Sequence, residues 1–151
     1  MKRIFWVLLI LAFLFVNEYL SKFLLAIFVG NLEFSQAIER TFQYATAKSY
    51  LLSAGFRIIP FVAIGLFAAK SRVTNSIIGI VGVWIITLFT ISFILYGYLG
   101  MQHSLFTDEH TSSTSALALI WIPIWAFLFV VVGAVALIVV SKIANFFQTR
   151  A

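Results

Sequence analysis

The sequence predicts an all-α membrane protein: a four-helix transmembrane bundle with both termini in the cytoplasm and an amphipathic segment after the first helix. Residues 116–140 contain no ionisable side chain. At about 1.5 Å per residue, a helix of that length is longer than the roughly 30 Å hydrocarbon core of a bilayer. Hydrophobic residues make up 63% of the 151 residues and charged residues 10%. A soluble domain carries about 25% charged residues, so the composition favours a membrane protein.

Four apolar stretches account for most of the chain. The predicted spans cover about residues 4–22, 50–69, 77–99 and 116–140, with outer loops at 31–49 and 100–115. Because the spans leave no segment long enough for a soluble domain, we expect residues 1–151 to form a single transmembrane domain. The first span lacks a small-residue cleavage site, so we expect it to stay uncleaved; a cleaved secretory signal is the alternative.

The connection at 31–49 carries an irregular helical stripe of apolar residues: Leu32, Phe34, Ile38, Phe42 and Ala45. The stripe predicts an amphipathic helix at the outer interface, or an outward extension of the second span, with Ser35 as its N-cap. A simple hairpin loop is the alternative, because the stripe is imperfect.

Several residues in the spans predict how the helices pack. Pro60 lies in the second span, and it predicts a kink because proline has no backbone N–H to donate. Gly79 and Gly82 begin the third span, where small residues allow helices to approach closely. Trp84 falls at neither membrane interface, so we expect it to pack against a neighbouring helix.

The charges predict the orientation. With the N-terminus in the cytoplasm, the inner side carries basic residues and no acid: Lys2, Arg3, Lys70, Arg72, Lys142 and Arg150. All five acids fall on or toward the outer side: Glu18, Glu33, Glu39, Asp108 and Glu109. Four basic residues fall on that side as well: Lys22, Arg40, Lys48 and Arg57. Lys and Arg concentrate in cytoplasmic loops, so the pattern predicts a cytoplasmic (inner) membrane protein with both termini inside. The net charge of +5 then reflects topology, and it does not point to nucleic acid as a partner.

Two opposite charges fall inside the predicted spans. Glu18 in the first span and Arg57 in the second both lie about 10 Å below the outer surface, counted at about 1.5 Å per residue. A lone ionised group in hydrocarbon costs several kcal/mol, and pairing at one depth offsets that cost. We interpret the two residues as a clamp between the helices. An ion or proton pathway, or an anion site at Arg57, is the functional alternative.

Other polar side chains are weaker candidates. Lys22 follows Glu18 by one helical turn, in the favourable order for an ion pair. A wider set could line a pathway or make helix contacts: Asn17, Lys22, Thr87, Thr90 and Ser92.

The loop at 100–115 holds the residues with metal-ligand chemistry: His103, Asp108, Glu109 and His110. Imidazole and carboxylate groups suit zinc, but their spacing matches no metal-binding motif. We therefore predict a solvated loop with no metal and no cofactor. The chain has no cysteine, which excludes disulfides and thiolate sites.

The small size and the apolar surfaces favour a non-enzymatic accessory or interaction subunit. Its partners would be the lipid bilayer and another membrane protein or a second copy of the chain, met through helix–helix contacts. One alternative is an oligomeric channel or transporter subunit for ions or small solutes, with several copies around a shared pore. A second alternative is an immunity protein against a membrane-targeted toxin.

Overall fold

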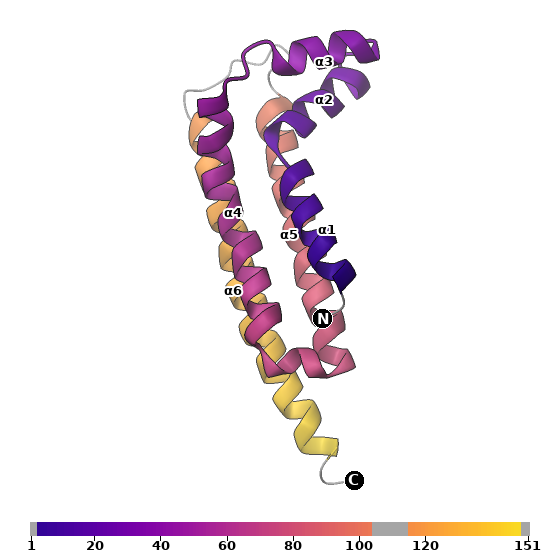
Figure 1. Ribbon diagram of the computed structural model, residues 1–151, viewed down its shortest axis with the longest axis vertical. Helices are drawn as coiled ribbons and strands as arrows, with labels where there is room; N and C mark the ends of the chain where they lie inside the picture. The colour runs from indigo at the N-terminus through magenta and orange to yellow at the C-terminus, as the bar shows by residue number, and fades with distance from the viewer. Residues whose placement is uncertain (1–2, 104–114, 149–151) are drawn as a thin grey trace.

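The computed structural model describes residues 3–103 and 115–148, and these form six α-helices and one short 3-10 helix without any β-strand. The elements follow one another along the chain (Figure 1): α1 (Arg3–Phe15), α2 (Glu18–Phe28), α3 (Phe34–Phe42), α4 (Ala47–Lys70), η1 (Arg72–Asn75), α5 (Ile77–His103) and α6 (Ser115–Gln148).

Three helices, α4, α5 and α6, are long and apolar enough to span a membrane, which indicates a membrane protein. They lie where the second, third and fourth spans are predicted, but each is longer than predicted. α4 begins at Ala47 because Thr46 and Ser49 form a capping box before its first turn. α5 continues to His103 and α6 to Gln148.

The predicted continuous helix over residues 4–22 is wrong. α1 and α2 are long and apolar enough to cross a membrane only when they are taken together, and they are bent by 67° at the break between them. Asn17 lies in the break with an extended backbone, φ −143° and ψ 172°. Its side-chain Oδ1 accepts a hydrogen bond from the Leu20 N–H at 2.8 Å, and its Nδ2 donates one to the Leu14 carbonyl at 2.9 Å. The Leu14 carbonyl lies at the end of α1 and the Leu20 N–H at the start of α2, where backbone groups lack hydrogen-bond partners within the helix. Asn17 therefore stabilises the break by binding both helix ends.

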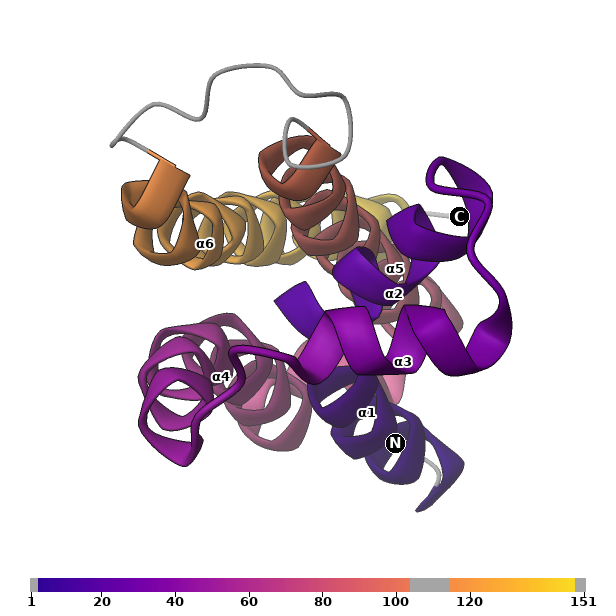
Figure 2. The same cartoon turned by 90° about the horizontal axis from the view of Figure 1, so that it is seen from above.

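The long helices pack in two rows. α6 lies along both α4 and α5, and α1 packs on α4. Seen from above, α4 and α1 form one row and α6 and α5 form the other (Figure 2). The predicted close approach at Gly82 is confirmed, because a Cβ on Gly82 would overlap the Leu137 side chain of α6. Trp84 packs edge-on against Phe5 of α1, with ring centroids 5.2 Å apart, as predicted.

The two ends of the bundle are built differently. At one end η1 joins α4 to α5, and Trp6 near the start of α1 lines a hollow there together with Lys70 and Asn75. At the other end α2 tilts away from the bundle axis, and α3 crosses over the helices (Figures 1 and 2). We call these the η1 end and the α3 end.

The amphipathic helix predicted within 31–49 is confirmed as α3, but the predicted N-cap is wrong. Glu33 occupies the cap position with an extended backbone, so the helix begins at Phe34 and Ser35 lies inside it. Phe34 is fixed there by an edge-to-face contact with Phe23 of α2, with ring centroids 5.4 Å apart. α3 thus lies against α2 at the α3 end.

Candidate functional site

The structure brings Glu18 and Arg57 together inside the bundle. Glu18 Oε2 lies 3.6 Å from a terminal nitrogen of Arg57, and the two residues are 6% and 0% exposed. Ser53, one turn before Arg57 on α4, donates a hydrogen bond to the same carboxylate oxygen at 2.7 Å. Tyr98 of α5 is buried close enough to interact electrostatically with both charges. We call Glu18, Ser53, Arg57 and Tyr98 the polar clamp.

The guanidinium of Arg57 is enclosed mainly by aromatic rings. It lies 5.2 Å from the ring centroid of Phe13 and 5.9 Å from that of Tyr50. A cation over an aromatic face is attracted to it, and the attraction strengthens when water is excluded. None of its three nitrogens has a hydrogen-bond partner, and neither does the Tyr98 hydroxyl, which faces Ser53. The polar clamp therefore contains N–H and O–H groups that could donate hydrogen bonds to a water molecule or an anion.

The pathway candidates on α5 do not join the polar clamp. Thr87 and Thr90 are buried, but each hydroxyl donates to a carbonyl of its own helix, that of Val83 and Ile86 respectively, at 2.8 Å. Ser92 is exposed on the outer surface of the bundle. Gln102, which was not predicted, is buried one turn beyond Tyr98, and its side-chain oxygen has no hydrogen-bond partner. Buried Ile94 separates Tyr98 from Thr90 along this face of α5.

Asn17 and Lys22 make their contacts outside the polar clamp. Asn17 caps the two helices that meet at the break. Lys22 does not pair with Glu18 in the described structure; its Nζ lies 5.8 Å from the Tyr19 ring centroid instead. Glu18 and Lys22 are one turn apart on α2, as predicted, but the Glu18 carboxylate binds Ser53 and Arg57 of α4 instead.

The metal-ligand candidates fall largely outside the described residues. His103 is exposed at the end of α5, whereas Asp108, Glu109 and His110 lie outside the described residues. Within residues 3–103 and 115–148, no group of three or more His, Asp or Glu side chains is arranged to hold a metal ion.

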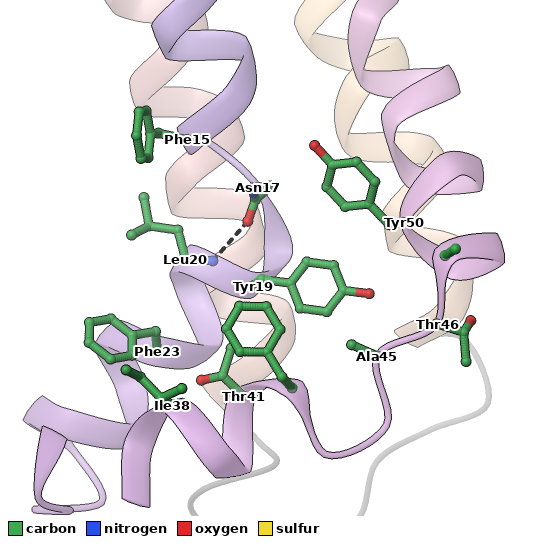
Figure 3. Close-up of a pocket in the computed structure, with 12 residues that line it drawn as sticks. Phe15, Asn17, Tyr19, Leu20, Phe23, Ile38, Thr41, Ala45, Thr46 and Tyr50 are labelled. Carbon is green, nitrogen blue, oxygen red and sulfur yellow. Dashed lines mark hydrogen bonds between the residues drawn. The ribbon is translucent and has the colours of Figure 1, made fainter. Parts of the chain in front are cut away.

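An aromatic groove adjoins the polar clamp at the α3 end. It has a volume of about 560 Å³ and lies between α2, α3 and the start of α4. Its walls are largely apolar and aromatic (Figure 3): Phe15, Asn17, Tyr19, Leu20, Phe23, Ile38, Thr41, Phe42, Ala45, Thr46, Ala47 and Tyr50. We refer to this set as the aromatic groove.

Tyr19 organises the aromatic groove. Its ring stacks on Phe42 of α3 at a centroid distance of 5.6 Å and lies 6.2 Å from Tyr50 of α4. Its hydroxyl shares a 3.1 Å hydrogen bond with the Ser49 hydroxyl. Tyr19 thus connects three helices, and it directly follows Glu18 of the polar clamp. Phe15 and Phe42 remain 63% and 56% exposed, so the aromatic groove is open to the surroundings.

Sequence reasoning identified Glu18 and Arg57 but missed Ser53, Tyr98 and the aromatic groove. Ser53 and Arg57 are four residues apart, which places them on one face of a helix. This spacing is the sequence signal that could have predicted a common partner for the two side chains. The contacts of Tyr19 with Phe42 and Tyr50 depend on how α3 folds back, which the sequence pattern does not specify.

Comparison of the chain with protein-family models, with curated proteins and with solved structures finds no match.

Proposed function

We propose that this protein is a four-span protein of a cytoplasmic (inner) membrane that acts as a non-enzymatic interaction subunit. The bent pair α1 and α2 would form the first span, and α4, α5 and α6 the other three. The partner would be another membrane protein or a second copy of this chain, bound at the aromatic groove.

The distribution of charge supports an orientation with both termini in the cytoplasm. The η1 end carries basic residues and no described acid: Arg3, Lys70, Arg72 and Lys142. The described acids, Glu18, Glu33 and Glu39, belong to α2 and the α3 segment, and the remaining described cations, Lys22, Arg40, Lys48 and Arg57, lie in α2, α3 and the first half of α4. The net charge is therefore more positive at the η1 end. By the positive-inside rule the η1 end faces the cytoplasm, and the aromatic groove then lies at the outer interface.

The observation that carries the proposal is the bend at Asn17. The 67° bend directs α2 away from the axis of α1, and α3 folds back against α2, so that Tyr19 reaches Phe42 and Ser49. A straight first span would continue along the α1 axis and would not form this groove. The polar clamp supports the bend, because Glu18 is bound to both Ser53 and Arg57 of α4.

The chemistry of the aromatic groove suits an apolar segment of a partner. Its open rim presents two large aromatic side chains, Phe15 and Phe42. In protein–protein interfaces, a few large side chains of this kind commonly contribute most of the binding energy. Contiguous exposed apolar surface outside the hydrocarbon core is costly unless a partner covers it. An apolar or amphipathic helix fits these walls best.

Measurement of particle mass tests the proposal. The tagged chain is extracted from its native membranes in mild detergent, and the mass of the protein component is measured. We expect a defined complex heavier than the 17.0 kDa chain. Multiples of the chain mass identify self-association, and other masses identify a different partner. A strict monomer from native membranes contradicts the proposal.

A subunit of a conducting pathway is the second candidate. The donors of Arg57 without hydrogen-bond partners and the Tyr98 hydroxyl favour it, because such groups stabilise water or an anion inside a membrane protein. Ion flux in liposomes that contain the purified chain tests it. Absence of flux at every protein density would exclude this candidate and leave the interaction proposal intact.

A further inference from the structure

We propose that a hollow at the η1 end binds the phosphate headgroup of an anionic phospholipid. The hollow has a volume of about 540 Å³ and lies between η1 and the later turns of α6. We call it the basic notch, and its lining residues used below are Arg72, Ser76, Ile138, Ser141 and Lys142. This inference goes beyond the proposed function and takes from it only the orientation that places the η1 end on the cytoplasmic side.

Two cations from separate elements line the basic notch. Arg72 belongs to η1 and Lys142 to α6, both are exposed, and none of the lining residues is acidic. Arg72 also lines a second hollow of about 450 Å³, where Lys70 adds a further cation. Like charges held around one hollow repel each other, and an anion bound between them removes that repulsion.

Ser141 provides a second, independent observation. It is buried beside Lys142 on the wall of the basic notch, and its hydroxyl has no hydrogen-bond partner. In contrast, the Ser76 hydroxyl is already used, since it donates to the Val73 carbonyl and accepts from the Gly79 N–H at 3.0 Å each. Native proteins rarely leave a buried hydroxyl unpaired. A phosphate oxygen held between Arg72 and Lys142 would supply the acceptor that Ser141 lacks.

The apolar surroundings favour a lipid over free phosphate. Ile138 forms part of the wall of the basic notch. Ile77, which follows the lining residue Ser76, and Val139 and Ile143, which follow the lining residues Ile138 and Lys142, expose large apolar side chains. In a bilayer these side chains contact acyl chains, so a ligand that joins a phosphate to acyl chains matches both parts of the surface. Basic pockets between spans on the cytoplasmic side bind anionic headgroups in general.

Native mass spectrometry of the full chain in detergent tests the proposal, with phosphatidylglycerol, cardiolipin and phosphatidylcholine as probes. We expect the two anionic lipids to remain bound and phosphatidylcholine to dissociate. Arg72→Gln with Lys142→Gln should weaken binding about 30-fold, because each cation near anionic headgroups contributes about fivefold. Lys22→Gln with Lys48→Gln is the matched control, since it removes the same charge at the α3 end. Ser141→Ala, which changes no charge, should weaken binding several-fold.

Three outcomes would overturn the proposal. Equal losses in the two double variants would show that net charge alone attracts the lipid. Equal retention of phosphatidylcholine and phosphatidylglycerol would show that the basic notch does not select an anion. Stabilisation by inorganic phosphate at the same concentration as phosphatidylglycerol would show that the ligand is free phosphate. If a double variant loses its helical circular dichroism signal, lipid retention is compared instead for the single variants and for Ser141→Ala.

Discussion

The carboxylate of Glu18 lies 3.6 Å from the guanidinium of Arg57, and Glu18 is the first residue of α2, directly after the break between α1 and α2. The ion pair therefore ties the start of α2 to α4. Ser53 binds the same carboxylate one turn earlier on α4, so α2 is held at two points. A carboxylate in the first turn of α2 also interacts favourably with the helix dipole.

Glu18→Gln is expected to lower the free energy of unfolding in detergent by about 3–5 kcal/mol, because it leaves Arg57 buried without a counter-charge. Arg57→Gln in the same chain should restore part of that loss, since it removes the uncompensated charge. Thermal unfolding of the single and double variants measures both effects. Exposed Glu39→Gln is the control and should change stability little. Strictly additive losses would show that the two side chains do not interact.

Asn17→Ala is expected to straighten the bend between α1 and α2. It removes both side-chain hydrogen bonds at the break, at a cost of about 1 kcal/mol, and it introduces the best helix former. The chain has no cysteine, so spin labels can be placed at exposed Ile4 and Phe28 alone. From the 67° bend and the helical rise, the backbone distance between them is about 30 Å, and a straight helix gives about 36 Å.

Pulsed electron paramagnetic resonance in lipid nanodiscs resolves this difference. Asn17→Ser keeps an acceptor for the start of α2 and should stay near the shorter distance. If the unmodified chain already gave the longer distance, the bend would be absent in a bilayer.

Gly79→Ala is expected to destabilise the connection at the η1 end. A Cβ at Gly79 would overlap the backbone carbonyl of Val73, so η1 would have to move. We expect a loss of about 1–3 kcal/mol in thermal unfolding, typical of overpacking. Gly55→Ala is the matched control, because nothing lies within 4 Å of the added Cβ. Equal effects of the two substitutions would contradict the close contact.

Ala45→Trp is expected to fill the aromatic groove without disturbing the polar clamp. Ala45 is an exposed residue of the groove lining. The variant should keep the thermal stability of the unmodified chain and lose most of the bound partner during purification in mild detergent. Ala45→Ser, which adds little volume, should retain the partner. Full retention by Ala45→Trp would place the partner elsewhere on the surface.

Much of the helical framework could be predicted from the sequence. α4, α5 and α6 are each continuous apolar runs, and such runs form helices in lipid because every backbone group must be paired within the segment. The matching depths of Glu18 and Arg57 followed from the rise per residue alone. They meet in the structure because Glu18 lies close to the hinge, where the bend displaces it least.

The break and the aromatic groove could not be predicted with the same reasoning. Asn followed by Glu is a typical helix start, but the polar residues that follow the apolar run, Asn17, Glu18, Ser21 and Lys22, also fit the outer end of one continuous span. The groove depends on a turn at Asn31, whose φ of 48° lies in the left-handed region and directs α3 back against α2. Asparagine tolerates that region, but its presence does not specify the turn.

Photo-crosslinking in native membranes tests directly whether a partner protein binds in the aromatic groove. Benzoylphenylalanine replaces Phe42 on the rim of the aromatic groove, or Val132 on the exposed surface of α6 as a control. The proposed function predicts a protein adduct of defined mass from position 42, little from position 132, and loss of the adduct when Ala45→Trp is added. Equal adducts from both positions, or lipid adducts alone from position 42, would contradict a partner in the aromatic groove.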